Sequence, residues 1–354
     1  MKKSNKSLLR VLGMSVLVSV SSSSFAELIN HAATNANGTA QLSWSSEDVN
    51  NLLNDDVVVQ DLDDDLSPQS SVTVTTTLRS SSDSTALQAP AKTVQILDTS
   101  KFSQQPTVTA RAALVMDANT GEVLYSKNSN TALPIASITK LMTAVVISDA
   151  RLNMSEKITL QQADFSCSGC KSSSSTLRAG DSMNRAEALL FALMKSENPA
   201  AAALARTYPG GRSAFISAMN SKAKALGMNS SHFLESTGLH PGNVASARDL
   251  GILVNAASQY GLIRQFSTTP SYDFNLGYRV LKSNNTNALV RNGGWNINIS
   301  KTGFINEAGR CVVMHTTLNN RPVAVVLLGA NNSANRTNDA TRLMTWVTNL
   351  PKQI

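Results

Sequence analysis

Aromatic side chains are scarce in this sequence: Phe, Trp and Tyr together make up 5% of its 354 residues. Proteins that bind single-stranded nucleic acid interleave basic residues with aromatic ones, on which the bases stack. No such interleaving occurs here, although the formal net charge is +7. The sequence therefore predicts no nucleic-acid partner, and the basic charge needs another explanation.

Histidine and cysteine are also few, with four histidines and three cysteines. The histidines fall at no metal-ligand spacing, so we expect no zinc site. Cys167 and Cys170 lie in a Ser-rich loop that does not open a helix after a strand, which argues against a thioredoxin-like redox pair. They form either a local disulfide or idle thiols, and Cys311 is expected to stay free on an apolar strand.

Long apolar runs are absent beyond the N-terminus. Residues 1–26 have the parts of a secretory signal peptide: a basic start, a short apolar run over 11–20 and a small–x–small end at Ser24-Phe25-Ala26. The apolar run is too short to span a bilayer comfortably, although an uncleaved N-terminal anchor is the alternative. We expect cleavage, export to the periplasm and a mature chain without a transmembrane segment.

Charge falls into three zones: +4 over residues 1–26, −8 over 27–105 and +11 over the remainder. The acidic zone is rich in Ser, Thr, Asn and Asp. It cannot bury enough apolar area to offset the entropy of ordering its backbone, so we predict a disordered tether over 27–105. Residues 106–354 are then the folded domain, whose basic charge suits polyanionic surroundings such as acidic glycans.

Strand patterns occur at both ends of this folded region, with helical patterns between them. Two β-hairpins are expected, with strands at 112–116 and 123–125, and at 311–318 and 322–328, and a further strand at 295–300. Helices are expected at 138–149, 186–194, 200–205, 215–226, 249–260 and 335–350. This grouping predicts an α+β fold, in which an antiparallel sheet from both chain ends holds an inserted helical subdomain.

A nucleophilic serine needs a base, and the usual histidine-based arrangements are missing: there is no Gly-x-Ser-x-Gly, and no histidine lies in a triad context. Ser137-Ile138-Thr139-Lys140 offers a lysine base instead, because residues three apart share one face of a helix. The helix is apolar nearly all round, so Lys140 should be desolvated and its pKa lowered. The Ser-x-x-Lys pattern alone is weak. It recurs at Ser168–Lys171 and Ser221–Lys224, and Ser137 could be a plain N-cap.

Two further motifs follow downstream. Ser196-Glu197-Asn198 falls in a break between two helices, where Ser196 could relay a proton and Asn198 could bind the substrate backbone. Asn198 before Pro199 is also a good N-cap, and both roles can hold at once. Lys301-Thr302-Gly303 lies on a strand; it supplies a cation, a hydroxyl and a site of close backbone approach, which together suit a ligand carboxylate. A surface strand ending in a turn is the alternative.

The three motifs, in this order, form the signature set of the penicillin-recognising serine enzymes, and the sequence resembles that family over most of residues 108–350. It is most similar to the penicillin-binding protein 7/8 group of D-alanyl-D-alanine endopeptidases. The similar stretches are 134–144, 194–198, 243–250 and 300–311. The resemblance implies a β-lactamase/transpeptidase-like fold, with a five-stranded antiparallel sheet and an inserted all-helical subdomain, and residues 106–354 as a serine DD-peptidase domain.

The resemblance also implies roles for the first two motifs. Ser137 would attack the carbonyl after the penultimate D-alanine and form an acyl-enzyme, and Lys140 would take its proton. Ser196 would shuttle protons with Lys140, and Asn198 would orient the substrate.

For the third motif, the resemblance implies that Lys301 and Thr302 hold a carboxylate, and that Gly303 lets the substrate come close. The backbone N–H groups of Ser137 and Phe304 would form the oxyanion hole. No metal or organic cofactor is needed. The expected partners are peptidoglycan stem peptides and cross-links, with β-lactam antibiotics as covalent inhibitors.

Two features depart from the family pattern: the glutamate in the middle of the second motif, whose side chain should point away from Ser137, and the Cys-x-x-Cys loop. The leading hypothesis is an endopeptidase that opens cross-links, with a D-alanyl-D-alanine carboxypeptidase as the alternative. A class A β-lactamase would need a Glu-x-x-Leu-Asn segment between the second and third motifs, and none is present. Intact Ser137, Lys140 and Lys301 argue against a non-catalytic cell-wall binding module.

Overall fold

The computed structural model describes residues 33–34, 40–41 and 105–351. The chain divides into two units, Met1–Trp44 and Ser45–Ile354. In the first unit, β1 (Ala33–Thr34) pairs antiparallel with β2 (Ala40–Gln41). The predicted signal peptide over 1–26 lies outside the described residues, as does nearly all of the predicted tether over 27–105, and both stay predictions.

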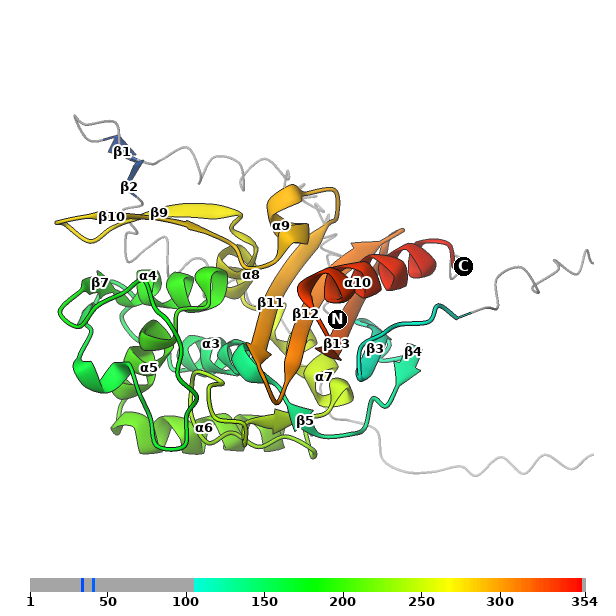
Figure 1. The fold of residues 1–354 in the computed structure, drawn as a ribbon, viewed down its shortest axis with the longest axis horizontal. Helices are drawn as coiled ribbons and strands as arrows, with labels where there is room; N and C mark the ends of the chain where they lie inside the picture. Colours follow the sequence, from blue (N-terminus) through cyan, green and yellow to red (C-terminus); the bar gives the residue numbers. More distant parts are fainter. Residues whose placement is uncertain (1–32, 35–39, 42–104, 352–354) are drawn as a thin grey trace, which may run out of the picture. The chain divides into compact units, whose positions relative to one another are not determined.

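A five-stranded antiparallel sheet forms the frame of the second unit (Figure 1). Its strands, in spatial order, are β11 (Ile297–Ile305), β12 (Gly309–Leu318), β13 (Arg321–Ala330), β3 (Ala112–Asp117) and β4 (Val123–Lys127). The two predicted hairpins are confirmed. Asn319 and Asn320, at φ 51° and 64°, make the tight turn between β12 and β13, since asparagine tolerates the left-handed conformation that such turns require.

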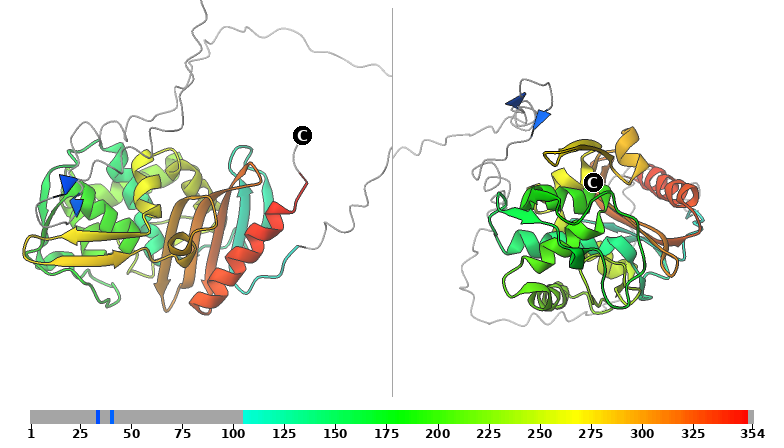
Figure 2. Two further views of the ribbon diagram at one scale, coloured as in Figure 1. Left: turned by 90° about the horizontal axis from the view of Figure 1, so that it is seen from above. Right: turned by 60° about the vertical axis from the view of Figure 1, so that its left-hand side comes forward.

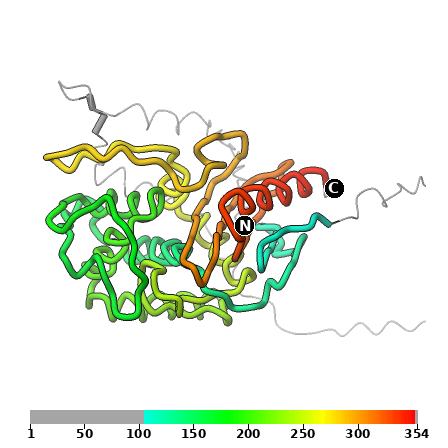
Figure 3. Tube along the Cα trace, viewed as in Figure 1, coloured from blue at the N-terminus to red at the C-terminus, as the bar shows by residue number. Residues whose placement is uncertain are grey.

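As predicted, the helical block of the described chain lies between the two halves of the sheet in the sequence, and one closing helix follows the last strand. Figure 3 follows the chain from β3 and β4 (cyan) through the helical block (green) back to β11–β13 (orange). The helices are α3 (Thr139–Asp149), α4 (Arg185–Leu190), α5 (Asn198–Arg206), α6 (Gly211–Ala225), α7 (Ala247–Ala257), α8 (Gly261–Thr268), α9 (Ala288–Asn292) and α10 (Ser333–Thr348). Short elements are η2 (Ala136–Ile138), η3 (Gln162–Asp164) and the π-helix η4 (Phe191–Lys195). Minor strands pair as β5 (Leu133–Pro134) with β8 (Val244–Ala245), β6 (Lys157–Thr159) with β7 (Ser182–Asn184), and β9 (Ser271–Asn275) with β10 (Val280–Asn284).

Helices cover both faces of the sheet (Figure 2). α10 packs on β12 and β13, and an apolar core that includes Val325, Leu327 and Leu343 fills the space between them. α7 packs on β3, β12 and β13, while α8 and η2 lie against β11. The predicted α+β fold with an inserted helical part is confirmed.

α3 lies at the centre of the helical part. Residues 139–148 of this helix are all buried, which agrees with a sequence that is apolar nearly all round. Its N-terminal end meets η2 and so reaches the edge strand β11. None of the helices among the described residues has the length and apolar character needed to cross a bilayer.

Candidate active site

A short 3-10 turn and the helix after it position the first motif. η2 carries Ser137, and α3 starts directly behind it and carries Lys140. The Lys140 Nζ lies 2.9 Å from Ser137 Oγ, as the spacing of three residues predicts. Ser137 is half-buried, whereas Ser221 and Lys224 of the competing pattern are exposed on α6. The structure therefore gives a buried amine only to the first of these two pairs.

The Lys140 amine is fully buried and has three acceptors. It donates to Ser137 Oγ, to Asn198 Oδ1 at 2.6 Å and to the Thr237 carbonyl at 2.6 Å. Three acceptors match the three N–H groups of an ammonium. If one proton leaves, two N–H groups remain for Asn198 and Thr237, and the lone pair can face the Ser137 hydroxyl. The geometry thus allows Lys140 to work as a base without any rearrangement.

Burial lowers the pKa of Lys140 to about 7, and the carboxylates of Glu235 and Glu197 oppose this shift. Lys301 is also buried, and its pKa lies well below the ordinary value because of burial first, and then because of the nearby charges of Lys140 and Arg336. The desolvation of Lys140 that the apolar helix predicted is confirmed.

Acylation of Ser137 should therefore accelerate as pH rises through about 7, because only the neutral Lys140 amine can accept the hydroxyl proton. The second-order rate constant for a fluorescent penicillin, measured across the neutral range, checks this. The expected curve has one rising limb whose midpoint is the pKa of Lys140. An acylation rate that does not change with pH over this range would contradict the assignment.

The second motif lies at an irregular junction between helices. α4 continues into the π-helix η4, which ends at Ser196 in the left-handed conformation, with φ 66°. Single-turn π-helices and non-glycine residues with positive φ are found at functional sites more often than elsewhere. α5 begins two residues later, at Asn198. The prediction that Asn198 caps α5 is wrong: Glu197 is the cap residue, and the Asn198 side chain is engaged by Lys140 instead.

The third motif lies on β11, at the edge of the sheet. Lys301 is 1% exposed and donates to Ser196 Oγ at 2.8 Å and to the Thr302 carbonyl at 3.0 Å. The Thr302 hydroxyl donates to Thr286 Oγ1 at 2.6 Å. Lys301 and Ser196, which are 105 residues apart in the sequence, are thus in direct contact.

Ser196 contacts a different lysine from the one that the family resemblance suggested. Its hydroxyl accepts from Lys301, and no hydrogen bond joins it to Lys140 among residues 105–351. The two lysines still influence each other, since Lys140 contributes to the lowered pKa of Lys301. A proton shuttle that involves Ser196 stays a prediction, and the structure makes Lys301 its immediate partner.

Gly303 brings the edge strand against the turn that holds Ser137. A β-carbon at Gly303 would lie 2.9 Å from the Ile135 carbonyl oxygen and 3.1 Å from the Ser137 nitrogen, closer than side chains normally pack. Phe304, the next residue, carries the second expected oxyanion donor. Because β11 is an edge strand, it has N–H groups on its cleft side that pair with no other strand. This geometry supports an oxyanion hole at Ser137 and Phe304, which stays a prediction.

Arg336 is a buried cation that the sequence analysis missed. It lies in the first turn of α10, is 7% exposed, and its guanidinium makes no hydrogen bond or ion pair with the described part of the chain. Its pKa is lowered by burial first and then by the charge of Arg310. Together with Lys301 it forms a cationic corner, which favours an anionic ligand.

Arg336 belongs to no motif, but one signal was present. It lies 4, 7 and 11 residues before the buried Ala340, Leu343 and Val347, so it falls on the buried stripe of α10. A charged residue on such a stripe needs a partner or a function.

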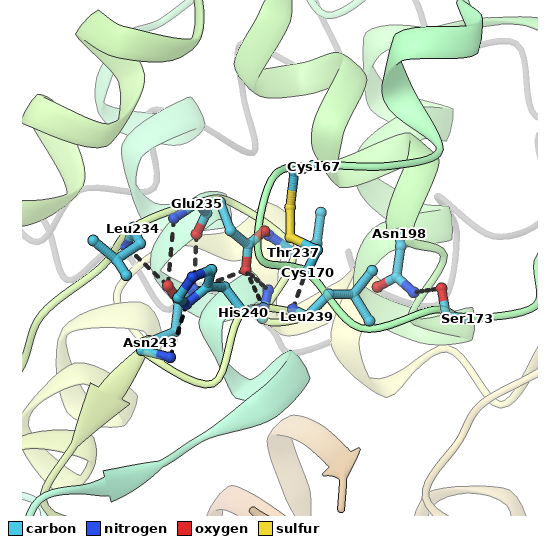
Figure 4. The surroundings of a disulfide bond; sticks show 12 residues. Cys167, Cys170, Ser173, Asn198, Leu234, Glu235, Thr237, Leu239, His240 and Asn243 are labelled. Atoms are coloured by element: carbon cyan, nitrogen blue, oxygen red, sulfur yellow. Dashed lines mark hydrogen bonds between the residues drawn. A yellow bond between two sulfur atoms is a disulfide. The ribbon is translucent and has the colours of Figure 1, made fainter. Parts of the chain in front are cut away.

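A disulfide-bonded loop lies next to the second motif. Cys167 and Cys170 are bridged, and Cys311 is free and buried. Figure 4 shows the bridge beside the segment 234–243, with Ser173 of the same loop pointing to Asn198. Glu235 also lies near the two sulfurs, but its carboxylate accepts hydrogen bonds from the backbone N–H groups of Thr237 and Gly238. The alternatives left open for the cysteines are thus resolved in favour of a local bridge.

A sheet built from both chain ends, an inserted helical part and a buried serine–lysine pair together define the class of penicillin-recognising serine peptidases. Comparison with known proteins confirms the class: a family model described as D-alanyl-D-alanine carboxypeptidase matches residues 99–332. The chain belongs to this family of serine DD-peptidases.

Two relatives and one solved structure show how close the similarity is. A D-alanyl-D-alanine endopeptidase of Pseudomonas aeruginosa is 47% identical over 250 residues, covering 69% of this chain and 78% of the relative. A D-alanyl-D-alanine endopeptidase of Escherichia coli is 47% identical over 265 residues, covering 74% and 83%. A DD-transpeptidase crystal structure from Streptomyces aligns with a TM-score of 0.64 and 30% identity, covering 70% of this chain and all of that one. The predicted fold class and family resemblance are confirmed.

Proposed function

We propose that this serine DD-peptidase hydrolyses D-alanyl-D-alanine cross-links of peptidoglycan through an acyl-enzyme on Ser137. The observation that supports this most directly is the buried Lys140 amine, which lies 2.9 Å from the Ser137 hydroxyl in a site that also holds Asn198 and Lys301. Endopeptidase is the activity named for two relatives that are 47% identical to the chain.

The proposed reaction has two halves. Neutral Lys140 takes the Ser137 proton as the serine oxygen attacks the D-alanyl carbonyl, and the N–H groups of Ser137 and Phe304 stabilise the oxyanion. The C–N bond then breaks, and the proton that Lys140 took passes to the leaving amine through the hydroxyl of Ser196, which Lys301 holds, so that Lys140 is neutral again. A water molecule, activated by the same lysine base, hydrolyses the ester and restores the serine.

The cationic corner explains which part of the substrate would be held. A carboxylate on the leaving-amine side of the scissile bond, as at the C-terminus of an uncross-linked stem peptide, matches Lys301, Thr302 and Arg336. The Arg336 guanidinium has no partner among the described residues, so substrate binding would supply one.

Arg336→Leu should lower kcat/KM for a peptide that carries this carboxylate by roughly 10–100-fold, since a charge-assisted hydrogen bond contributes about 1.5–3 kcal/mol. An amidated version of the same peptide should lose much less, because it offers no charge to Arg336. Arg342→Leu is the matched control: Arg342 lies on the same helix, with its side chain 52% exposed, and should leave both rates unchanged. Equal losses for the acid and the amide would contradict a carboxylate contact.

Digestion of purified sacculi, followed by separation of the muropeptides, tests the bond that is cleaved. An endopeptidase should deplete cross-linked dimers and release monomers. Depletion of monomeric pentapeptides with the dimers left intact would establish the carboxypeptidase instead, which is the activity in the description of the matching family.

Two other functions make different predictions with β-lactams. A β-lactamase would turn over a chromogenic β-lactam rapidly, whereas the proposed peptidase should hold a long-lived acyl-enzyme. A non-catalytic binding module would give no covalent label at all. We further propose that the enzyme is exported to the periplasm by its N-terminal signal and acts on the sacculus there, where its basic domain would meet an acidic polymer.

A further inference from the structure

The two features that depart from the family pattern, Glu197 and the Cys-x-x-Cys loop, are in contact with each other. Glu197 is 5% exposed and turns away from Lys140 and Ser137 toward residues 165–177, the cysteine loop. Its Oε2 accepts from the Ser175 hydroxyl at 2.6 Å, and its Oε1 accepts from the Thr176 hydroxyl at 2.5 Å and the Thr176 N–H at 3.2 Å. A single carboxylate thus binds three donors of the loop.

Polar contacts, rather than apolar packing, hold the cysteine loop in place. Every side chain over 166–176 is exposed or half-buried, and the first fully buried one is Leu177 at its end. The disulfide closes the loop on itself. Besides Glu197 and Asn198, the loop is tied by the Lys171 N–H to the Leu239 carbonyl at 3.0 Å, by the Arg279 guanidinium to the Thr176 carbonyl at 3.0 Å, and by an ion pair between Lys171 and Glu307 at 2.6 Å. That ion pair is more than one third exposed on both sides, so it contributes little. Glu197 is therefore the main buried anchor.

The same loop also reaches a residue of the site. Ser173 Oγ accepts a hydrogen bond of 2.8 Å from Asn198 Nδ2, as Figure 4 shows. The other end of that amide, Oδ1, accepts from Lys140 at 2.6 Å. Rotation of the amide by 180° would turn its NH₂ group toward the lysine and lose that contact, whereas the Ser173 hydroxyl could then donate to the amide oxygen. Lys140 therefore sets which end of the amide faces it, and Ser173 fixes the place of the other end.

We propose that Glu197 is a positioning residue: it anchors the cysteine loop to the second motif, so that Ser173 and Lys140 hold the two ends of the Asn198 amide between them. The inference rests on the proposed roles of Ser137 and Lys140. It adds the residues that support Lys140, first Asn198 and then the loop held by Glu197. Glu197 and the disulfide-bonded loop would then have the same role, which is to fix the position of Lys140.

Glu197→Gln is the first test, with acylation by a fluorescent penicillin as the readout. The change keeps the shape of the side chain but leaves one acceptor oxygen for three donors. Acylation should slow at least about tenfold, since a shift of about 1 Å in a site can cost about 100-fold. Hydrogen exchange over 165–177 should increase in the same variant.

Asp249→Asn is the matched control. Asp249 is also 5% exposed, and its carboxylate also binds one backbone N–H (Ser230) and one hydroxyl (Ser231), but on α7, away from the loop. It should lower the melting temperature about as much as Glu197→Gln does and leave the acylation rate unchanged. Equal slowing in both variants would mean that lost stability, and not positioning, explains the effect, and would overturn the proposal.

The contact can also be broken from the loop side, which covers the case in which the Glu197 variant does not fold. Ser175→Ala with Thr176→Val removes both hydroxyl donors and should slow acylation in the same way. Adding Glu197→Gln to this pair should cost little more, because all three changes break one contact. Fully additive losses would overturn the proposal.

The pH profile of acylation separates two effects of Glu197: its hydrogen bonds to the loop and its negative charge near Lys140. The charged groups that act on Lys140 are Glu235, Glu197 and Lys301, and Glu197 raises the pKa of Lys140. Glu197→Gln should therefore move the rising limb to lower pH while lowering its plateau, whereas the loop-side variant should lower the plateau alone. An unchanged plateau in both variants would overturn the proposal. Failure of wild-type protein to label at all would refute the proposed function instead, and the exchange data would still test the anchor.

Discussion

Ser137→Ala should abolish covalent labelling by a fluorescent penicillin and lower the DD-peptidase rate by roughly a million-fold, the size of loss seen when a catalytic serine is removed. The reason is that the Ser137 hydroxyl would form the acyl bond, and it lies 2.9 Å from the buried Lys140 amine, whose pKa of about 7 suits a base. A labelled gel of wild type and variant measures the first effect, and hydrolysis of a D-alanyl-D-alanine peptide measures the second.

Ser221→Ala is the control for this prediction. Ser221 also precedes a lysine by three residues, but both lie exposed on α6. That variant should label like wild type. Equal labelling of the Ser137→Ala protein and the wild type would refute both the nucleophile and the proposed function.

Lys140→Arg should lower acylation by about 10²–10⁴-fold, the usual contribution of a general base. Arginine keeps the positive charge but cannot give up its proton in a protein, so no neutral base forms at any accessible pH. Lys140→Met, which has nearly the same length and no charge, separates the loss of the base from strain caused by the larger guanidinium. Both variants should be inactive, and the methionine variant should keep its fold by circular dichroism.

The pH profile distinguishes these variants from a merely damaged enzyme. Wild-type acylation should rise through about pH 7, whereas the small residual rate of either variant should lack this limb. If Lys140→Arg retained the same limb, another group would have to be the base.

The fold could be predicted from the sequence because each of its elements has a local signal. The alternation and turn residues around Asn319–Asn320 define a hairpin, and the apolar run over 139–148 defines a central helix. The hairpin of β9 and β10 was missed, since each strand has only five residues and the alternation in β9 is limited to Tyr272 and Phe274, too short a pattern to define a strand.

The site was predicted where spacing within a helix decides the geometry, as for Ser137 and Lys140. It was not predicted where distant segments meet. The contact of Lys301 with Ser196, the π-helix that turns Ser196 and the role of Asn198 in place of a helix cap all depend on tertiary packing. The sequence placed the right residues near one another but could not assign their hydrogen bonds.

Glu197 is a further residue whose hydrogen bonds could not be predicted from the sequence. The sequence indicated correctly that its side chain points away from the nucleophile, but the partners at Ser175 and Thr176 lie across a loop that has no pattern of its own. Hydrogen bonds between a helix cap and a polar loop produce no repeating pattern of residue types by which a sequence could predict them.

The burial of Cys311 has a consequence for the oxidative folding of this chain. Three cysteines allow three possible pairings, and only one of them is native. In the folded protein Cys311 is 0% exposed within β12, and burial raises the pKa of its thiol to about 11, so almost no thiolate exists to attack the bridge. Once the sheet has closed, the odd thiol is withdrawn from disulfide exchange and from cross-linking to other chains. Mispairing is thus confined to the period before the sheet forms, and the burial of one thiol in β12 protects the disulfide of the cysteine loop from exchange.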